Sequence, residues 1–409
     1  MRHRVGLLLL VLIAGALATA GLAMAFTPND ADWNFMWPQE RVNMTRAWNL
    51  SRGNRHVIVA VVDTGVNPKL RDFKGALVPG KDFVSGGYTK VDDDGHGTEL
   101  ASIIAARGNN GTGIPGYCWG CKVMPVRVAD GNPQTGPSIS MGLAAQGIRW
   151  AADHGANIIE MSFSEEAGEG SDPGVASAIA YAARKGILVL ASAGNTGNSG
   201  STYPAANPGA YPVAATTRFD KLSTYSTRGN WIHLAAPGCQ LALSQTGVAI
   251  EPCGTSLSAP AVAGVAGLML SVNPSLTPSQ IVSILQRTAK PVAGIAGGRI
   301  NAYRAVRAAA ATAAFRAGHP VRLSRLLGNR WNLGLAVQGE RVALTLRSPK
   351  APSCSLSLAS SDGVWLTSRR GRRADSLFAR ISTGKYRLGV SCRLRRLRSA
   401  SLTLRAFAH

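Results

Sequence analysis

The sequence predicts an α/β fold in which a parallel sheet is flanked by helices on both faces, followed by a small all-β, sandwich-like domain. Two observations predict the first part. Apolar, strand-like runs alternate with Ala-rich helical segments between residues 57 and 270, and the run at 57–66 is continuous and rich in β-branched residues, as buried parallel strands are. The second part is predicted by short alternating segments after about residue 308.

The other elements follow from the same patterns. Further strands are expected at residues 123–128, 158–161, 187–191 and 213–215. Helices are expected at residues 138–154, 174–185, 256–271 and 277–289, the last of which opens on a Thr-Pro-Ser-Gln start signal. Strands of the C-terminal part are expected at residues 342–347, 354–358, 386–392 and 401–405.

A serine stands at the start of the helix expected at 256–271. The stretch Gly-Thr-Ser-Leu-Ser-Ala-Pro delivers Ser256 from a turn of small residues into an apolar helix, with Pro260 where a first-turn proline is tolerated. The free N–H groups and the positive dipole end of a helix start favour negative charge on a reacting oxygen, which suits a nucleophile. The alternative is a serine that merely caps a buried helix.

Two upstream segments favour the nucleophile. Asp63 ends the strand expected at 57–66, and the carboxyl ends of strands are where open α/β sheets place their sites. His96 stands between two glycines before the apolar stretch at 100–106. Either residue alone could be a cap or a satisfied core group. Together with Ser256 they form a triad hypothesis of nucleophile, general base and orienting carboxylate.

These three segments resemble the catalytic signatures of the subtilisin-like serine peptidases, and they are most similar to the thermitase-type branch. The resemblance covers about residues 26–308, and includes the amino-terminal stretch 26–30 and the closing stretch 298–306. It implies a serine endopeptidase that works through an acyl-enzyme, in which Asp63 orients, His96 is the base and Ser256 attacks.

An amide supplies the remaining catalytic group. The strand at 187–191 runs into a Gly-rich turn that carries Asn195. Acyl transfer needs donors aimed at the developing oxyanion, and the Asn195 side chain and the Ser256 backbone N–H could supply them. The alternative is a turn asparagine with no catalytic role.

The resemblance also implies where substrate binds. Two backbone stretches are expected to pair with an extended peptide: Ser162, Phe163 and Ser164, and Ala191, Ser192, Ala193 and Gly194. Thr202 aligns with the floor of the first specificity pocket. An acidic cluster beside this region predicts either a preference for Lys- or Arg-containing substrates or a solvated acidic loop. Its members are Glu165, Glu166, Glu169 and Asp172.

Calcium is the expected cofactor, in a structural role. Positions that resemble the family's tight calcium loop offer side-chain oxygens and two backbone carbonyls, a donor set that suits this hard cation. The side chains are those of Asp30, Asp82, Asn110 and Thr112, and the carbonyls are those of Arg107 and Ile114. The alternative is a Gly/Asn loop that holds no ion.

Residues 1–25 predict export. A basic start, an apolar core and a small-x-small ending make a signal peptide, whose cleavage would leave Phe26 as the amino terminus. The uninterrupted apolar run is also long enough for an uncleaved membrane anchor. The enzyme is therefore expected to be secreted, or held in the periplasm or cell envelope.

Six cysteines in an exported chain indicate disulfides. Fifteen pairings are possible, and proximity in the sequence favours three: Cys118 with Cys121, Cys239 with Cys253, and Cys354 with Cys392. The first pair could instead be a redox Cys-x-x-Cys, although its loop lacks the thioredoxin pattern. A zinc site is disfavoured because no second close Cys/His pair exists.

The charge separates two parts of the chain. We expect a peptidase domain at 26–308, a linker at 309–320 and a basic β-rich domain at 321–409. The chain carries +22 in all, and residues 315–409 hold 19 Lys/Arg against 3 Asp/Glu. Such a field attracts polyanions, including anionic envelope lipids. No base-reading motif supports specific nucleic-acid binding, and the alternative is an ordinary solvated surface.

The expected function is thus an exported serine endopeptidase that acts on protein or peptide substrates as a monomer. A non-catalytic binding protein with a degenerate peptidase fold is the rival from another class, and the intact triad positions argue against it. A tethered processing protease is the other alternative, which a retained amino-terminal anchor would favour.

Overall fold

The structure is a computed structural model of the 409-residue chain. It describes residues 25–87, 92–131, 138–164 and 170–311, and beyond these the backbone of eight strands between 320 and 407. The predicted signal peptide, most of the predicted linker, the acidic residues Glu165, Glu166 and Glu169, and the densest basic runs at 369–373 and 393–398 lie outside the described residues.

A nine-stranded sheet forms the centre of the part before residue 312, in the order β12-β13-β9-β8-β7-β6-β1-β3-β2. All its pairs are parallel except the edge pair β12–β13. Its strands are β1 (Ile58–Asp63), β2 (Lys81–Asp82), β3 (Lys122–Arg127), β6 (Ile158–Met161), β7 (Leu188–Ser192), β8 (Ala210–Thr216), β9 (Leu234–Pro237), β12 (Lys290–Pro291) and β13 (Gly298–Arg299). The predicted parallel sheet is confirmed.

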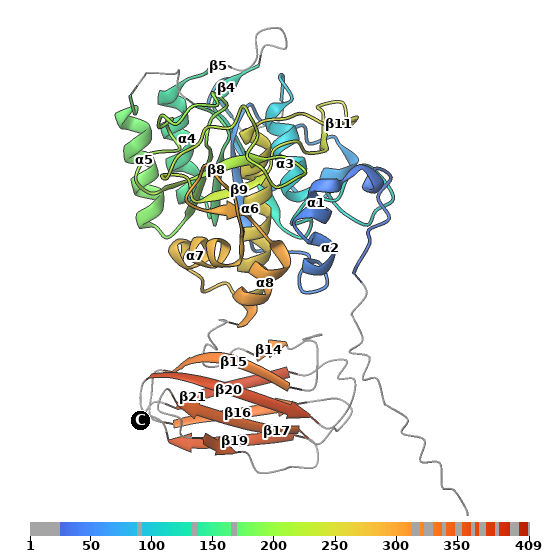
Figure 1. Cartoon of the computed structure of the whole chain (residues 1–409), viewed down its shortest axis with the longest axis vertical. Coiled ribbons are helices and arrows are strands. Elements are labelled where there is room, and N and C mark those ends of the chain that lie inside the picture. The colour runs from blue at the N-terminus through green and yellow to red at the C-terminus, as the bar shows by residue number, and fades with distance from the viewer. Residues whose placement is uncertain are drawn as a thin grey trace, which may run out of the picture.

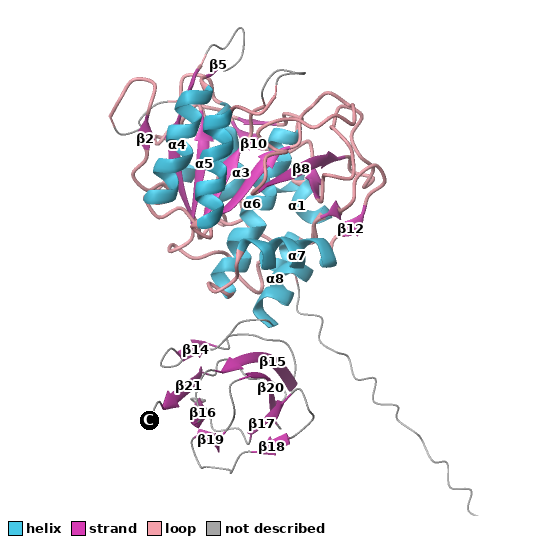
Figure 2. Ribbon diagram, turned by 90° about the vertical axis from the view of Figure 1, so that its left-hand side faces the viewer, coloured by secondary structure: helices cyan, strands magenta, loops and turns pink. Residues whose placement is uncertain are grey.

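Helices cover both faces of this sheet (Figures 1 and 2). On one face, α4 (Met141–Asp153) and α5 (Pro173–Arg184) lie side by side over an apolar layer that includes Val62, Val126 and Ile159. On the other face, α3 (His96–Ala105) packs against α6 (Thr255–Val272), and a larger apolar cluster fills the space between them and the sheet. The strands are apolar on both faces because both are buried.

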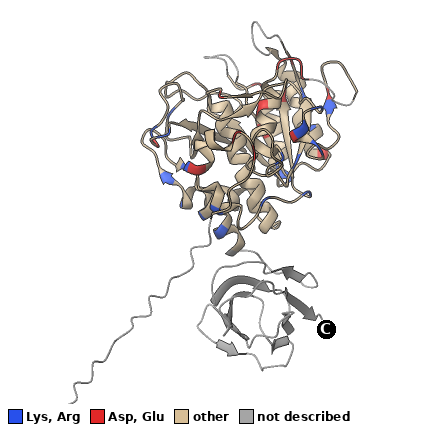
Figure 3. Ribbon diagram, turned by 90° about the vertical axis from the view of Figure 1, so that its right-hand side faces the viewer, with Lys and Arg blue, Asp and Glu red and all other residues tan. Residues whose placement is uncertain are grey.

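Shorter elements complete this part of the chain. The remaining helices are η1 (Trp33–Phe35), α1 (Trp37–Arg41), α2 (Met44–Ala47), η2 (Arg71–Phe73), α7 (Pro278–Thr288) and α8 (Ala302–Ala311). Two small hairpins pair β4 (Ala129–Asp130) with β5 (Ser138–Ile139), and β10 (Ala242–Leu243) with β11 (Ala249–Ile250). Charged residues are scattered among elements that are mostly uncharged (Figure 3).

Helix α6 is the central helix, and nearly all of its residues are buried. Among the described residues it alone is long and apolar enough to cross a membrane, and its burial within the fold explains that composition. The helix starts at Thr255, so Pro260 lies inside the helix, in its second turn, and not in the first turn as the sequence indicated. The helix predicted at 138–154 also differs, because residues 138–139 form β5 and Ser140 is the N-cap, its hydroxyl accepting from the Leu143 N–H.

The C-terminal part consists of two antiparallel four-stranded sheets, as the all-β prediction requires. One sheet has the order β14-β21-β16-β19 and the other β15-β20-β17-β18. Their strands are β14 (Pro320–Arg322), β15 (Arg330–Val337), β16 (Arg341–Arg347), β17 (Cys354–Ser360), β18 (Trp365–Thr367), β19 (Ala374–Arg380), β20 (Gly384–Cys392) and β21 (Ser401–Phe407). In the register of β17 and β20, Cys354 lies opposite Cys392.

Candidate active site

Asp63 is the last residue of β1 and is fully buried. One carboxylate oxygen, Oδ1, accepts the Thr64 backbone N–H at 2.8 Å and lies 2.8 Å from Nδ1 of His96. Because an ionised carboxylate only accepts hydrogen bonds, the His96 Nδ1 carries the proton of this contact. That tautomer leaves Nε2 of the imidazole able to accept a proton.

The start of α3 is held by Asp92, which is also buried. Its Oδ1 accepts from the Thr64 hydroxyl and from the Gly95 N–H, and its Oδ2 accepts from the N–H and hydroxyl of Thr98. The carboxylate thereby satisfies free donors at the helix start and ties this helix to the residue after Asp63. This role of Asp92 was not predicted from the sequence, although the Asp-Asp-Asp run before His96 was its signal.

Two glycines around His96 are required by the backbone. Gly95 has φ +114°, a conformation that side-chain-bearing residues rarely adopt. A Cβ atom on Gly97 would lie 2.1 Å from the carbonyl oxygen of Gly65, so only glycine lets α3 approach the end of β1 this closely. This close approach places the imidazole against Asp63.

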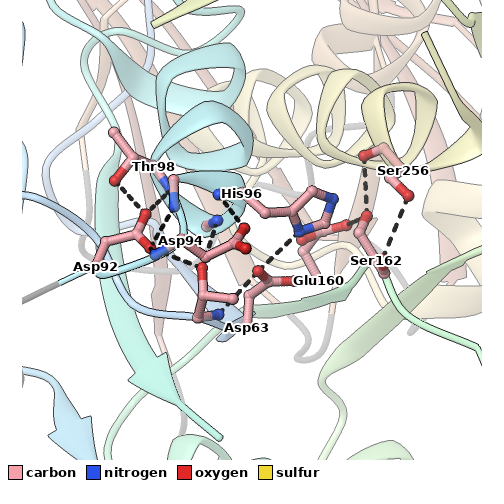
Figure 4. Close-up of polar contacts among 11 residues, drawn as sticks. Asp63, Asp92, Asp94, His96, Thr98, Glu160, Ser162 and Ser256 are labelled. Atoms are coloured by element: carbon pink, nitrogen blue, oxygen red, sulfur yellow. Dashed lines mark hydrogen bonds and ion pairs between the residues drawn. The ribbon is translucent and has the colours of Figure 1, made fainter. Parts of the chain in front are cut away.

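The imidazole of His96 is 23% exposed and faces the start of α6 (Figure 4). Burial lowers the pKa of His96, but the charge of Asp63 and its hydrogen bond raise that pKa more, as do the more distant Glu99 and Glu160, so the net shift is upward. Asp63 thus favours the protonated form of the imidazole.

Ser256 is the second residue of α6, which starts at Thr255 directly after the extended N-cap Gly254. Its Oγ donates to the backbone carbonyl of Ser162 at 3.3 Å, and no hydrogen bond joins it to His96 among the described contacts. Serine and imidazole nevertheless lie in the same site (Figure 4). Catalytic hydrogen bonds are often long or poorly aligned until substrate binds.

Asn195 follows β7 and is exposed. Its side-chain Oδ1 accepts from the backbone N–H of Thr255 at 2.9 Å and from the Thr255 hydroxyl at 3.0 Å. With Oδ1 fixed in this way, the amide Nδ2 is directed elsewhere, and it lies 3.6 Å from the position of a Cβ atom on Gly254. The Asn195 amide is therefore held beside the N-terminus of α6.

Two disulfides lie in this part of the chain, and both are among the predicted pairs. Cys239 and Cys253 are joined across an isolated β-bridge. Because Cys253 lies three residues before Ser256, this disulfide anchors the turn that carries Ser256. Cys118 is joined to Cys121 in the loop before β3. The third predicted pair, Cys354 with Cys392, has the opposed backbone register described above, and its side chains lie outside the described residues.

The two stretches expected to bind substrate lie next to each other at the ends of β6 and β7, where Met161 is in register with Ala191. Both stretches contact the start of α6, through the Ser162–Ser256 contacts and through the Gly194 N–H, which donates to the Thr255 hydroxyl at 3.1 Å. Among the expected residues, Phe163, Ser192 and Ala193 are buried and Ser164 is exposed. The hydroxyl of Thr202 donates to the Ala193 carbonyl at 2.7 Å.

The acidic side chain of Asp172 has a different role from the one considered in the sequence. It is the N-cap of α5, and its Oδ1 accepts from the Val175 N–H at 2.8 Å. A cap of this kind is a structural contribution.

The loop expected to bind calcium needs one correction. Asp82 does not lie with this loop: its carboxylate accepts from the N–H groups of Val84 and Ser85 and from the buried guanidinium of Arg127. Asp72 lies there instead and accepts from the Asn110 amide at 2.7 Å, with the Thr112 hydroxyl 3.4 Å away. Asp72 was not predicted as a calcium ligand because it lies in a short polar stretch with no strand or helix pattern.

Two buried carboxylates contact this loop: Asp30 accepts from the Asn109 N–H, and Asp72 accepts from the Asn110 amide. Asp30 and Asp72 are both buried, and Asp30 Oδ1 has no hydrogen-bond partner among the described residues. Burial raises the pKa of Asp30, the N–H groups of Asn109 and Asn110 lower it, and Asp72 raises it further. Burial likewise raises the pKa of Asp72, against the hydrogen bonds of Asn110 and Thr112.

No positively charged side chain forms an ion pair with either carboxylate in the part of the chain that the structure describes. That part also contains no group of three or more His, Cys, Asp or Glu side chains that could hold a metal. Two carboxylates, an amide oxygen and backbone carbonyls nevertheless fit a calcium ion, which accepts a mixed set of oxygen ligands.

Glu160 is a further buried carboxyl group, which was not predicted from the sequence. It lies in β6 beside Ser162 (Figure 4) and its exposed fraction is 0%. A glutamate inside an otherwise apolar strand was the available signal, because charged residues are rarely buried without a partner.

Comparison with known proteins gives consistent results. Residues 54–320 match the family described as the subtilase family. Thermitase of Thermoactinomyces vulgaris is 38% identical over 287 residues, which cover 69% of this chain and 99% of the relative. An extracellular protease of Xanthomonas campestris pv. campestris is 30% identical over 345 residues, covering 72% of this chain and 58% of that protein.

Among solved structures, a protease of Pseudoalteromonas arctica PAMC 21717 superimposes with a TM-score of 0.63 at 29% identity. The match covers 69% of this chain and 99% of that one.

Proposed function

The chain belongs to the subtilase family of serine proteases, and on that premise we propose that it is an exported endopeptidase that uses Asp63, His96 and Ser256 as its catalytic triad. The observation that carries the proposal is the 2.8 Å hydrogen bond between His96 and the buried Asp63, with Ser256 facing the same imidazole (Figure 4).

In the first half of the reaction, Ser256 Oγ attacks the carbonyl carbon of the scissile peptide bond while its proton passes to Nε2 of His96. Asp63 stays ionised, holds the imidazole in the required tautomer and stabilises its positive charge. The imidazolium then gives its proton to the leaving amine, and an acyl-enzyme on Ser256 remains. Water attacks this ester with His96 again as base, which releases the acid and restores the serine.

The tetrahedral intermediates carry a negatively charged oxygen, which we place between the Asn195 amide and the Ser256 backbone N–H. Support comes from the fixed orientation of Asn195, whose Oδ1 is held by Thr255 so that the N–H₂ end is available. Donors held in place before the reaction stabilise developing charge without reorganisation.

Substrate would lie in extended form along residues 162–164 and 191–194, using backbone pairing for affinity. Both stretches follow parallel strands and contact the start of α6. Thr202 would contribute to the first specificity pocket through its contact with Ala193. Cleavage products of a peptide library would test this placement, since Thr202→Gly should broaden the residues accepted before the scissile bond.

The test of the triad is labelling of the purified protein with a fluorophosphonate probe, beside a Ser256→Ala control. We expect labelling in the parent protein and none in the variant, with hydrolysis of a peptide substrate lost in parallel. A folded parent protein that neither labels nor cleaves would refute the proposal and leave a non-catalytic role for this domain.

We further propose that calcium binds Asp30, Asp72, Asn110 and Thr112, together with the carbonyls of Arg107 and Ile114. The ion would supply positive charge between two buried carboxylates and thereby stabilise the loop. The unpartnered Asp30 Oδ1 and the raised pKa values of Asp30 and Asp72 support this assignment.

Export and domain organisation are also proposed. The relatives include a protein named as an extracellular protease, and the first 25 residues have the pattern of a signal peptide. The amino terminus of the exported protein should be Phe26 if the signal is cleaved, and N-terminal sequencing would show a longer form if the anchor is retained.

The basic β-rich part after residue 320 is proposed to bind anionic envelope components, with Cys354 and Cys392 joined in a third disulfide. Its excess of 15 positive charges and the opposed register of the two cysteines support these assignments. Retention of the full chain on anionic but not zwitterionic vesicles at low salt would test the first, and mass mapping of disulfide-linked peptides would test the second.

A further inference from the structure

Pro260 leaves one carbonyl of the candidate nucleophile without its helical partner. In an α-helix the carbonyl of residue i accepts the N–H of residue i+4. For Ser256 in α6 that residue is Pro260, which has no N–H. The Ser256 carbonyl instead lies 2.9 Å from the hydroxyl of Ser162, which donates to it from outside the helix.

The Ser162 hydroxyl has two oxygen neighbours. Besides the Ser256 carbonyl, its Oγ is in hydrogen-bond contact with Oε1 of Glu160 (Figure 4). A hydroxyl has a single proton and a carbonyl has none, so Ser162 can donate to only one of these two oxygens. Which of these two oxygens receives the Ser162 proton therefore depends on whether Glu160 is ionised or protonated.

An ionised Glu160 could only accept, and it would compete with the Ser256 carbonyl for the one Ser162 proton. A protonated Glu160 would donate its O–H to Ser162 Oγ, and Ser162 could then donate to the Ser256 carbonyl. Only a protonated Glu160 provides one proton for each of the two contacts, the one between Glu160 and Ser162 and the one between Ser162 and the Ser256 carbonyl.

The surroundings of Glu160 also favour the neutral form. It is fully buried between β1 and β7, in register with Val61 and Leu190, and its Oε2 has no hydrogen-bond partner among the described residues. An unpartnered oxygen is far less unfavourable on a neutral acid than on a buried carboxylate.

The charged groups that face Glu160 are Asp63 at the end of β1 and His96 at the start of α3, and neither β7 nor α6 contributes one. Burial raises the pKa of Glu160, the Ser162 hydrogen bond lowers it, Asp63 raises it and His96 lowers it, with a net value of about 8. No Lys or Arg forms an ion pair with Glu160 within the described ranges.

We propose that Glu160 is a positioning residue that acts as a neutral carboxylic acid. Its proton satisfies Ser162, Ser162 in turn satisfies the Ser256 carbonyl, and the start of α6 is thereby held against the end of β6. The inference rests on the proposed role of Ser256 as the nucleophile. Loss of the Glu160 proton at alkaline pH would withdraw the Ser162 proton from Ser256 and add a negative charge beside Asp63 and His96.

The test compares Glu160→Gln with Glu160→Ala across pH 6 to 10. The glutamine amide is a permanent, uncharged donor to Ser162, whereas alanine removes the donor. We expect the kcat of the parent protein to fall on an alkaline limb, Glu160→Gln to retain most of the activity at pH 7 without that limb, and Glu160→Ala to lose activity at every pH. Glu40→Gln, at an exposed position of α1, is the matched control.

An alkaline limb that persists unchanged in Glu160→Gln, or a folded Glu160→Gln that is as inactive as Glu160→Ala, would overturn the proposal. So would a parent protein whose kcat shows no alkaline limb.

A readout that does not need activity separates this inference from the proposed function. In the Ser256→Ala background, the infrared spectrum near pH 6 should contain a carboxylic-acid C=O band that Glu160→Gln removes and that alkaline titration abolishes. If the band is absent near pH 6, the inference fails even where the parent protein labels normally with a fluorophosphonate. If the parent protein does not label but the band is present, the proposed function fails and the hydrogen-bonded chain stands.

Discussion

The side-chain oxygen of Asn195 is fixed by Thr255, the residue before Ser256, through its backbone N–H at 2.9 Å and its hydroxyl at 3.0 Å. The turn after β7 and the start of α6 therefore hold each other in place. Since an asparagine has one acceptor end and one donor end, fixing the oxygen decides where the N–H₂ group points.

Removing this amide should lower the rate of the chemical step. We expect Asn195→Ala to reduce kcat by about 10²–10³-fold with little change in KM, the size found when subtilisin, a member of this family, loses an oxyanion donor. Asn198→Ala is the matched control, because Asn198 is exposed in the same turn and its Oδ1 accepts only from Gly200 in the described contacts. Steady-state kinetics on one peptide substrate would measure both. Equal losses in the two variants would mean that the turn, and not the amide, matters.

Asp63 should control both the rate and the pH dependence. Asp63→Asn should lower kcat by about 10⁴-fold, because an amide can hold the imidazole in the wrong tautomer. The variant should also lower the pKa of His96, which the Asp63 charge raises in the folded protein. Since the base must be neutral, the acid limb of kcat/KM should move to lower pH.

Profiles of kcat/KM against pH for Asp63→Asn and for the exposed Asp153→Asn would measure this shift. An acid limb that stays in place in Asp63→Asn would show that another group sets it.

Glu99, in the first turn of α3, should make the folded protein less stable as pH rises. Burial raises its pKa, His96 lowers it, and the neighbouring Asp94, Asp92 and Asp63 raise it, with a net value of about 7 against 4.5 for the free side chain. Between these values the folded state keeps a proton that the unfolded state has lost. The free energy of unfolding therefore falls from about pH 4.5 to about pH 7 and this contribution is constant above that.

We expect Glu99→Gln to remove this part of the pH dependence, so that its stability relative to the parent protein increases from pH 5 to pH 8. Urea unfolding in the inactive Ser256→Ala background would measure it without self-digestion. A stability difference that is the same at both pH values would contradict the expectation.

Calcium should stabilise the protein through Asp72 and not through Asp82. At a concentration 100 times its Kd, a ligand that binds only the folded state adds about 2.7 kcal/mol of stability. We expect chelation to lower the Tm of the parent protein and of Asp82→Asn, and to leave the Tm of Asp72→Asn unchanged. Asp82→Asn is a strict comparison, because Asp82 is equally buried but pairs with Arg127. A calcium response lost in Asp82→Asn and kept in Asp72→Asn would restore the assignment made from the sequence.

The architecture and the three residues of the candidate triad could be predicted from short stretches of sequence. The apolar β-branched run that ends at Asp63, the glycines around His96 and the small-residue turn before Ser256 are local patterns, and local patterns report strand, helix start and turn directly. The alternation of such segments also predicted a parallel sheet with helices on both faces, because strands buried on both faces must be apolar throughout.

Which side chains meet across the fold could not be predicted in this way and depends on the three-dimensional packing. Asp72 and Asp82 are both polar residues in short segments, and folding alone brings the first to Asn110 and the second to Arg127. In the same way, Pro260 is far in the sequence from Ser162 and Glu160. The packing of α6 against β6 brings them together, so that the Ser162 hydroxyl can donate to the carbonyl that Pro260 leaves without a helical N–H. Such contacts depend on long-range packing, about which the local periodicity of a sequence carries no information.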